Sequence, residues 1–147
     1  MARVVGVNVS VNRTDPKINI GRAELRVHHG LVGDSHAGLS EREVSLLALE
    51  TIAEVNREYG IGAIPGSFAE NLTLEGLDLM TLHVGDRLRV GQALLEVVQI
   101  GKPADAAHTY NFRGVSALPR QGVFCRVVRG GVVCRGDALQ VLPREEP

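Results

Sequence analysis

Hydrophobic and polar residues alternate along several short stretches of the chain, a pattern typical of β-strands. Residues 4–9 are dense in β-branched side chains and predict a strand. Along residues 23–28, Ala23, Leu25 and Val27 fall on one face and charged or polar residues on the other. This alternation predicts a second, half-buried strand after a polar loop.

A helical pattern follows from about Ala48 to Tyr59. Within it, Leu49, Ile52 and Asn56 recur at helical spacing. Gly60 stands where a helix typically ends, because glycine readily takes the left-handed backbone conformation found there. We therefore expect one main helix in this segment.

The second half of the chain returns to strand patterns, over residues 87–90, 93–100, 122–128 and 132–134. Gly91-Gln92 suits a two-residue hairpin turn, and Gly130-Gly131 predicts another hairpin between the last two strands. The long apolar run from Ala93 to Ile100 is expected to be buried on both faces. Many short strands separated by turn signals favour a closed or partly open barrel, or a sandwich, over a parallel sheet.

Composition narrows the class of protein. The 147 residues fit one domain spanning 1–147, and with 44% hydrophobic but only 3% aromatic residues the core must be aliphatic. A net charge of −1 gives no basic surface for nucleic acid. No apolar run approaches the roughly 20 residues that span a bilayer, and no secretory signal is evident. We expect a cytoplasmic protein without a membrane partner.

The most polar glycine-rich segment runs from Gly30 to Gly38 and contains Gly33, Asp34 and His36. Its glycines permit a positive φ, and successive backbone amides in such a loop can bind an anion. Asp34 and His36 add an acid–base pair near neutral pH. The alternative is a structural turn in which Asp34 caps its own backbone.

A metal site is the other chemistry to consider here. His28, His29, Asp34 and His36 could supply ligands, but no closed zinc-type ligand set appears. Adjacent residues of a strand point to opposite faces, so His28 and His29 would not converge. We expect no dedicated metal site.

Two further segments carry polar candidates. In residues 67–73, Glu70 and Asn71 could face a pocket or could satisfy the backbone of a turn. After the long apolar strand, Lys102 and Arg120 could bind a phosphate or other oxyanion. The alternative for that region is a solvated loop without a ligand.

Cys125 and Cys134 are too few for a disulfide framework. Neither a two-residue nor a three-residue turn at Gly130-Gly131 brings them to the Cα separation of about 5.5–6 Å that a disulfide prefers. We expect both to act as small core hydrophobes.

Taken in order, these segments resemble the MOSC domain, the C-terminal domain of molybdenum-cofactor sulfurases. The resemblance extends from about Val4 to Leu142. It rests on Gly30-x-x-Gly33-Asp34-x-His36-x-Gly38, Arg42-Glu43-Val44-Ser45-Leu46-Leu47 with Glu50, Pro65-Gly66-x-Phe68-x-Glu70-Asn71-Leu72, Leu82-x-Val84-Gly85-Asp86, Gln99-Ile100-Gly101-Lys102, Pro119-Arg120-x-Gly122-Val123-Phe124 and Gly131-x-Val133-x-x-Gly136-Asp137.

The resemblance implies a mainly-β fold, a MOSC-like barrel with one main α-helix and short connecting helices. It also implies a molybdenum–pterin cofactor or a sulfur-bearing ligand in a pocket at the barrel mouth. Asp34 and His36 would orient the ligand or relay protons. The cofactor-binding candidates are Gly30, Gly33, Asn71, Lys102, His108 and Arg120. A cysteine desulfurase or a molybdoenzyme is the implied partner.

The chain departs from the family at two positions. Similar small members carry cysteines where this sequence has Ala104 and His108, and alanine cannot replace a thiolate as a sulfur nucleophile. Three functions stay open: a cofactor-binding or sulfur-handling domain with sulfurtransferase-like activity, a non-catalytic anion or cofactor module, and a molybdenum-dependent reductase of N-hydroxylated compounds. No residue supports pyridoxal phosphate binding.

Overall fold

The computed structural model describes residues 2–101 and 111–143. The strands in this part are β1 (Arg3–Val9), β2 (Ile18–Asn19), β3 (Arg22–Arg26), β4 (Gly30–Leu31), β5 (Val44–Ala48), β6 (Leu72–Glu75), β7 (Arg87–Val90), β8 (Ala93–Ile100), β9 (Val123–Arg129), β10 (Gly131–Cys134) and β11 (Leu139–Val141). The helices are α1 (Leu49–Tyr59), α2 (Leu118–Gln121) and the 3₁₀ helix η1 (Leu79–Thr81).

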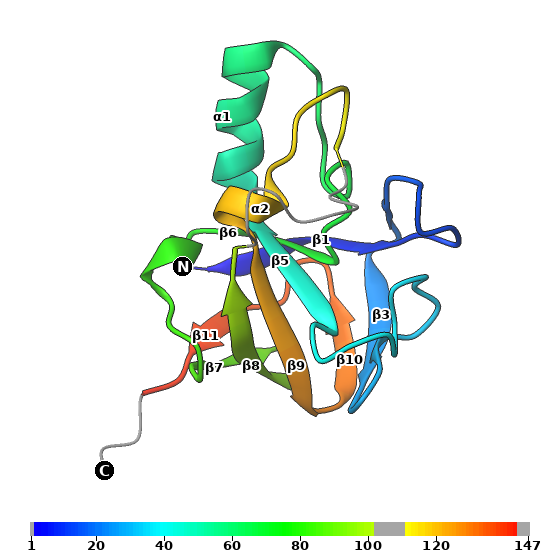
Figure 1. The fold of residues 1–147 in the computed structure, drawn as a ribbon. Coiled ribbons are helices and arrows are strands. Elements are labelled where there is room, and N and C mark those ends of the chain that lie inside the picture. The colour runs from blue at the N-terminus through cyan, green and yellow to red at the C-terminus, as the bar shows by residue number, and fades with distance from the viewer. Residues whose placement is uncertain (1, 102–110, 144–147) are drawn as a thin grey trace.

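Eight of these strands form one curled sheet in the order β11-β7-β8-β9-β5-β6-β1-β2. All neighbouring pairs are antiparallel except β5 and β6, which run parallel across the α1 connection. A bridge between Arg3 and Ala138 joins β1 to the chain just before β11, so the two sides of the sheet meet. The predicted mainly-β, partly open barrel is confirmed (Figure 1).

The remaining strands form a small sheet in the order β10-β3-β4, which contacts β1, β8 and β9 of the large sheet. The predicted hairpin between the last two long strands is therefore wrong, because β10 pairs with β3 and not with β9. A side chain at Gly130 would lie 2.6 Å from the backbone oxygen of Leu25. The glycine pair thus lets the chain cross closely from one sheet to the other.

The core is aliphatic, as the composition predicts, and it has two parts. The larger part fills the barrel, and the smaller lies beneath α1 around Phe68. Strand β5 is buried on both faces because it separates them: Val44 and Leu46 face the barrel interior, whereas Leu47 packs under the helix.

The main helix α1 confirms the prediction for 48–59. It ends at Gly60, which has φ 62° and donates its N–H to the carbonyl of Asn56. Ile52 is its buried anchor in the smaller core. The helix stands on one end of the barrel, with α2 close to its base (Figure 1).

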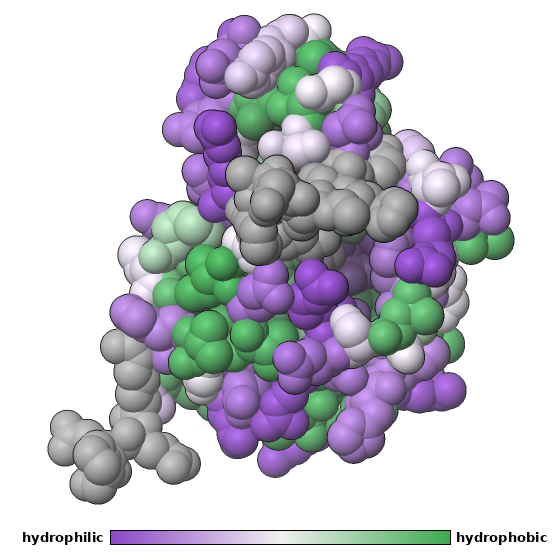
Figure 2. All heavy atoms as spheres, in the orientation of Figure 1, coloured by the Kyte–Doolittle hydropathy of each residue, from purple (hydrophilic) through white to green (hydrophobic). Residues whose placement is uncertain are grey.

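Two predictions about burial are wrong. Strand β8 alternates between buried and half-buried residues, because its outer face meets solvent and carries Glu96 between Arg87 and Arg126. Apolar and polar residues accordingly share the surface over this part of the barrel (Figure 2). Val27 is 43% exposed, because β3 ends at Arg26 and the chain turns before the expected end of the strand.

Candidate functional site

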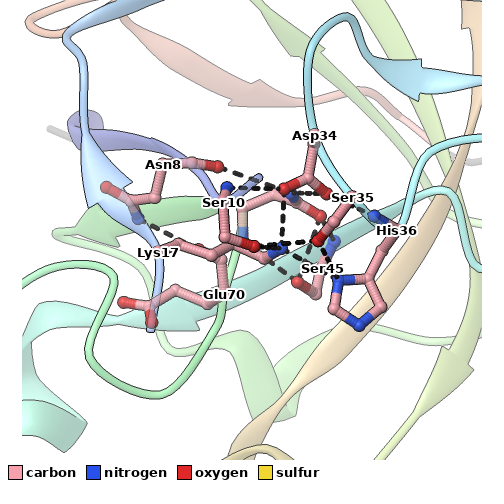
Figure 3. A network of polar contacts seen from close by, with 9 residues as sticks. Asn8, Ser10, Lys17, Asp34, Ser35, His36, Ser45 and Glu70 are labelled. Carbon is pink, nitrogen blue, oxygen red and sulfur yellow. Dashed lines mark hydrogen bonds and ion pairs between the residues drawn. The ribbon is translucent and has the colours of Figure 1, made fainter. Parts of the chain in front are cut away.

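A buried ion pair between Lys17 and Asp34 lies at the centre of the polar cluster in Figure 3. Lys17 Nζ is 2.6 Å from Asp34 Oδ1, and each side chain is only 1% exposed. Lys17 comes just before β2, and Asp34 follows β4. The pair therefore ties together two segments that no strand ladder connects.

The Asp34 carboxylate accepts hydrogen bonds from four groups. Oδ1 accepts from Ser10 N (3.0 Å) and Lys17, while Oδ2 accepts from Asn71 Nδ2 (3.1 Å) and His36 N (3.3 Å). Burial by itself raises the pKa of Asp34, but the hydrogen bond and charge of Lys17, with the bonds from Ser10 and Asn71, bring the pKa below its ordinary value. Asp34 is thus a carboxylate at neutral pH.

Lys17 directs its three ammonium hydrogens to three acceptors. Besides Asp34, these are Ser10 Oγ at 3.2 Å and His36 Nδ1 at 3.0 Å. Burial lowers the pKa of Lys17 below its ordinary value, against the opposing effects of Asp34 and Glu70. Because every hydrogen has an acceptor and a carboxylate is adjacent, the charged form is the one this site stabilises.

His36 lies half-buried at the edge of this cluster. Its Nδ1 is turned toward Lys17 and toward Ser35 Oγ, 3.3 Å away, and the other ring nitrogen points out of the cluster (Figure 3). Ser35 Oγ lies 2.9 Å from Ser10 Oγ, so the two hydroxyls connect the ion pair to the imidazole by a second route.

Asn71 fixes the cluster to the barrel. Its Oδ1 accepts from Ser45 N (3.0 Å) and Ser45 Oγ (3.2 Å) on β5, while its Nδ2 donates to Asp34. The side chain is buried, at 3% exposure for the residue. Asn71 therefore reaches the Asp34 loop, and its amide bridges that loop to a central strand.

Glu70, the neighbour of Asn71, is a second buried carboxylate with different partners. It accepts from Gly66 N (3.0 Å), Phe68 N (3.2 Å) and Thr73 Oγ1 (2.7 Å). Burial raises the pKa of Glu70 above its ordinary value, and these hydrogen bonds oppose the rise only in part. Of the two interpretations left open for Glu70, the contacts agree with the one in which it satisfies the backbone of a turn.

Asn8 lies between the two carboxylates and is fully buried. Its Nδ2 donates to Glu70 O (3.1 Å) and to Thr73 Oγ1 (3.0 Å). Among the described residues, its Oδ1 has no hydrogen-bond partner. A side chain at Gly6 would lie 2.9 Å from that oxygen, so Gly6 is required for the amide to fit.

The glycines of the predicted loop differ in what they do. Gly30 has φ 116°, and a Cβ there would lie 2.4 Å from Glu43 O, so only glycine allows this approach. Gly33 has φ 91° but would place a Cβ in open space. Gly30 thus holds the loop against the segment that leads into β5, whereas Gly33 only shapes a turn.

The remaining cofactor-binding candidates lie elsewhere or cannot be placed. Lys102 and His108 lie outside the described residues, as does Ala104. Arg120 is exposed on α2, next to β5. The described structure thus brings Asn71 to Asp34, which lies 37 residues earlier in the sequence, and to its loop neighbour His36.

The metal candidates do not converge. In the described part of the chain, no group of three or more histidine, cysteine or acidic side chains could hold a metal ion. His28 and His29 lie in a turn after β3, where His28 has φ 61°, and not on a strand as expected.

In the part of the chain that the structure describes, none of the helices has the length and apolar character needed to cross a membrane.

Both cysteines are free. Cys125 is fully buried on β9 between Val44 and Val97, which confirms it as a core residue, and burial together with the charge of Glu96 raises the pKa of its thiol. Cys134 is half-buried on β10, in the other sheet.

Two surface grooves lie outside the polar cluster. One, of 440 Å³, is lined by His28, Gly38, Leu39, Ser40, Glu41, Glu43, Arg126 and Val127. The other, of 700 Å³, is lined by His83, Val84, Gly85, Asp86, Arg87, Glu96, Leu142 and Pro143. Neither groove is lined by Lys17 or Asp34, so the buried ion pair lies apart from both grooves.

Lys17 was not among the candidate residues, because it stands in a polar stretch that predicts a loop. One signal was available: the chain has 14 arginines and only two lysines, Lys17 and Lys102. An ammonium group can satisfy three separate acceptors around one nitrogen, which a planar guanidinium cannot. Ser10 and Ser45 were missed as well, since a lone serine carries no pattern.

Comparison with known proteins agrees with this architecture. The MOSC domain family model matches residues 25–140, whereas no curated protein sequence matches. Among solved structures, the YuaD protein from Bacillus subtilis has a TM-score of 0.74 at 19% identity, with 96% of each chain covered.

Two YiiM structures are also similar. The one from Geobacillus stearothermophilus has a TM-score of 0.75 at 22% identity, over 98% of this chain and 76% of that one. The one from Escherichia coli has a TM-score of 0.73 at 23% identity, over 100% and 72%. These likenesses concern the fold, and the family model covers most of the sequence: the chain belongs to the MOSC domain family.

Proposed function

We propose that this MOSC domain binds the molybdenum cofactor, or a related ligand that carries an oxyanion, beside His36 at the barrel mouth. The observation that carries the proposal is the convergence of Lys17, Asp34 and His36 in a molecule whose core is otherwise largely aliphatic. A buried ion pair is costly to desolvate and weak evidence of stability alone, so its presence supports a role in shaping a site.

The donors at this edge suit the oxygen atoms of such a ligand. His36 is half-buried and carries an N–H group, whereas the backbone amides of residues 34–38 already donate to acceptors within the chain. Asp34 already neutralises Lys17, so the ion pair brings no net charge to the ligand. We assign charge compensation to Lys102 and Arg120, with His108 as a further contact. Asp34 and Asn71 anchor the loop that carries His36.

When bound, the cofactor would supply a metal that can hold a transferable sulfur or oxygen atom. The described chain offers that metal no thiolate. Cys125 is fully buried with a raised pKa, Cys134 is half-buried in the other sheet, and Ala104 stands at the family cysteine position. Of the functions left open by the sequence, the positions of these thiols favour a binding module without covalent sulfur transfer over a sulfur carrier.

Cofactor content tests the proposal. The protein is purified from a host that makes the cofactor and from one that does not, and molybdenum and oxidised pterin are measured per chain. We expect both only in the first preparation, and their loss in His36→Asn but not in His83→Asn, whose histidine is 69% exposed and lies by the other groove. Absence of both from the wild type, also after addition of free cofactor, overturns the proposal.

Cyanolysis separates a binding module from a sulfur carrier. After incubation with a cysteine desulfurase and cysteine, treatment with cyanide should release no thiocyanate from the protein. Thiol labelling adds a second measurement: Cys125 should react slowly in the folded state and Cys134 faster. Sulfur release, or fast labelling of Cys125, would instead support the carrier.

A further inference from the structure

The contacts of Lys17 determine where the imidazole of His36 carries its hydrogen. Lys17 Nζ lies 3.0 Å from His36 Nδ1, and its other two hydrogens point to Ser10 Oγ and Asp34 Oδ1. An ammonium group can only donate. His36 Nδ1 must therefore be the acceptor in this contact, without a hydrogen of its own.

The serine route leads to the same state. Ser10 Oγ accepts from Lys17, which leaves its own hydrogen for Ser35 Oγ at 2.9 Å. The hydroxyl of Ser35 then has its hydrogen available for His36 Nδ1 at 3.3 Å. A hydrogen on Nδ1 would face the ammonium group at 3.0 Å, so both routes oppose that tautomer.

We propose that Lys17 is the positioning residue of the site: it holds the His36 ring in the Nε2-protonated tautomer, so that His36 offers an N–H donor to an oxyanion of the ligand. The second half of this statement rests on the proposed function, and the first half does not. Asp34 makes the arrangement possible, because it neutralises the buried ammonium group and is itself anchored to the barrel through Asn71.

This tautomer also selects the class of ligand atom. A histidine binds a metal ion through an unprotonated ring nitrogen. In His36 the lone pair of Nδ1 is engaged by Lys17, and Nε2 carries the hydrogen. The ring is thus prepared for an acceptor oxygen of a phosphate, a pterin or a metal-bound oxo group, and not for direct coordination.

Nitrogen NMR tests the first half without any ligand. Long-range proton–nitrogen correlation spectra of the full chain show which ring nitrogen carries the hydrogen. We expect a single Nε2-protonated tautomer for His36, whereas exposed His28 should show the averaged signals of a mixture. A hydrogen on Nδ1 of His36 in the wild type overturns the proposal.

Variants assign the effect to Lys17. Lys17→Met with Asp34→Asn removes both charges together, and we expect the His36 signals to move toward those of His28. Ser35→Ala removes the other Nδ1 partner and should leave them unchanged. A change with Ser35→Ala but none with the double variant overturns the role of Lys17. If the double variant does not fold, the spectra of the wild type and of Ser35→Ala still show which tautomer His36 adopts and whether that tautomer depends on Ser35.

Binding tests the second half. The amide nitrogen of glutamine reaches about as far as histidine Nε2, whereas that of asparagine lies near the Nδ1 position. We expect His36→Gln to keep cofactor binding within a few-fold and His36→Asn to weaken it by about 10- to 100-fold, the usual loss for a hydrogen bond to a charged group. The reverse order overturns this half. If even the wild type binds no cofactor, the proposed function fails while the NMR result stands.

Discussion

Two carboxylates are buried within one polar cluster, and they do different work. Asp34 is paired with an ammonium group, and its side-chain partners Lys17 and Asn71 lie 17 and 37 residues away in sequence. Glu70 is held by two amides and a hydroxyl, all within four residues. Burial affects both, yet the pKa of Asp34 falls below its ordinary value and that of Glu70 rises above it.

The difference shows that the partners of a buried carboxylate, and not burial alone, decide what it contributes. Glu70 stabilises the local turn that leads into β6. Asp34 connects the end of β1, the segment before β2, the glycine loop and, through Asn71, strand β5. Loss of Asp34 should therefore disturb tertiary structure, whereas loss of the Glu70 charge should disturb one turn.

The largest expected effect comes from Asp34→Ala. It leaves the buried ammonium group of Lys17 without its counter-ion, and removing one partner of a buried pair typically costs about 3–5 kcal/mol. Urea unfolding measures the loss, with Asp15→Ala, which changes an exposed aspartate, as the control expected to stay within about 0.5 kcal/mol. A loss for Asp34→Ala no larger than for the control would show that the pair does not stabilise the fold.

Gly30→Ala should follow, because it forces a Cβ to within 2.4 Å of the Glu43 carbonyl at φ 116°. We expect about 2–4 kcal/mol of destabilisation from backbone strain and overpacking together. Gly33→Ala is the matched control, with a positive φ but open space, and should cost about 1–2 kcal/mol. Equal losses at the two positions would mean that φ alone matters and that the approach to Glu43 does not.

Glu70→Gln should cost less than Asp34→Ala, at about 1 kcal/mol. Glutamine keeps one acceptor oxygen for the Gly66 and Thr73 side, and one weak contact, that from Phe68 N at 3.2 Å, is lost. The same urea experiment measures the change. A cost equal to that of Asp34→Ala would remove the distinction between the two carboxylates.

The pH dependence of stability gives the finest test, because the two groups have opposite signs. The folded-state pKa of Asp34 is lowered, so its contribution is present above about pH 4 and is lost as the pH falls through the folded pKa. The folded-state pKa of Glu70 is raised, so its contribution is present below about pH 4.3 and is lost as the pH rises through the folded pKa.

Unfolding midpoints recorded across this range should separate the two. Relative to the wild type, Glu70→Gln should gain stability as the pH rises. As the pH falls below about 4, the free energy of unfolding of Asp34→Asn should decrease less than that of the wild type. Parallel profiles for both variants would contradict the assignment of opposite signs.

Much of the fold follows from local pattern. Dense β-branched residues place β1, alternation places β3 and β7, and a continuous apolar run places β8. Helical spacing with Gly60 places α1 to within one residue. The hairpin at Gly91-Gln92 is confirmed by the pairing of Val90 with Ala93. These features depend on neighbours in sequence, which is why a single sequence contains them.

What local pattern could not reveal depends on distant segments. Gly130-Gly131 resembles a hairpin turn, but the approach of Leu25 from another sheet sets its role. Asp34 and His36 were identifiable from their glycine-rich loop and Asn71 from a short polar segment, whereas Lys17 became a candidate only when its acceptors were seen around it. A buried cation in a loop is defined by its partners, and those partners come from two other segments: Ser10 follows β1, and Asp34 and His36 follow β4.

The bridge between Arg3 and Ala138 has a consequence for folding during synthesis. Strand β1 can pair with β2 and β6 early, but its contact near β11 cannot form until residue 138 has left the ribosome. Contacts between such distant residues carry a large loop-closure entropy and slow the folding of β-rich domains. The barrel of the nascent chain should therefore stay open, with its aliphatic interior exposed, until the last strands emerge from the ribosome.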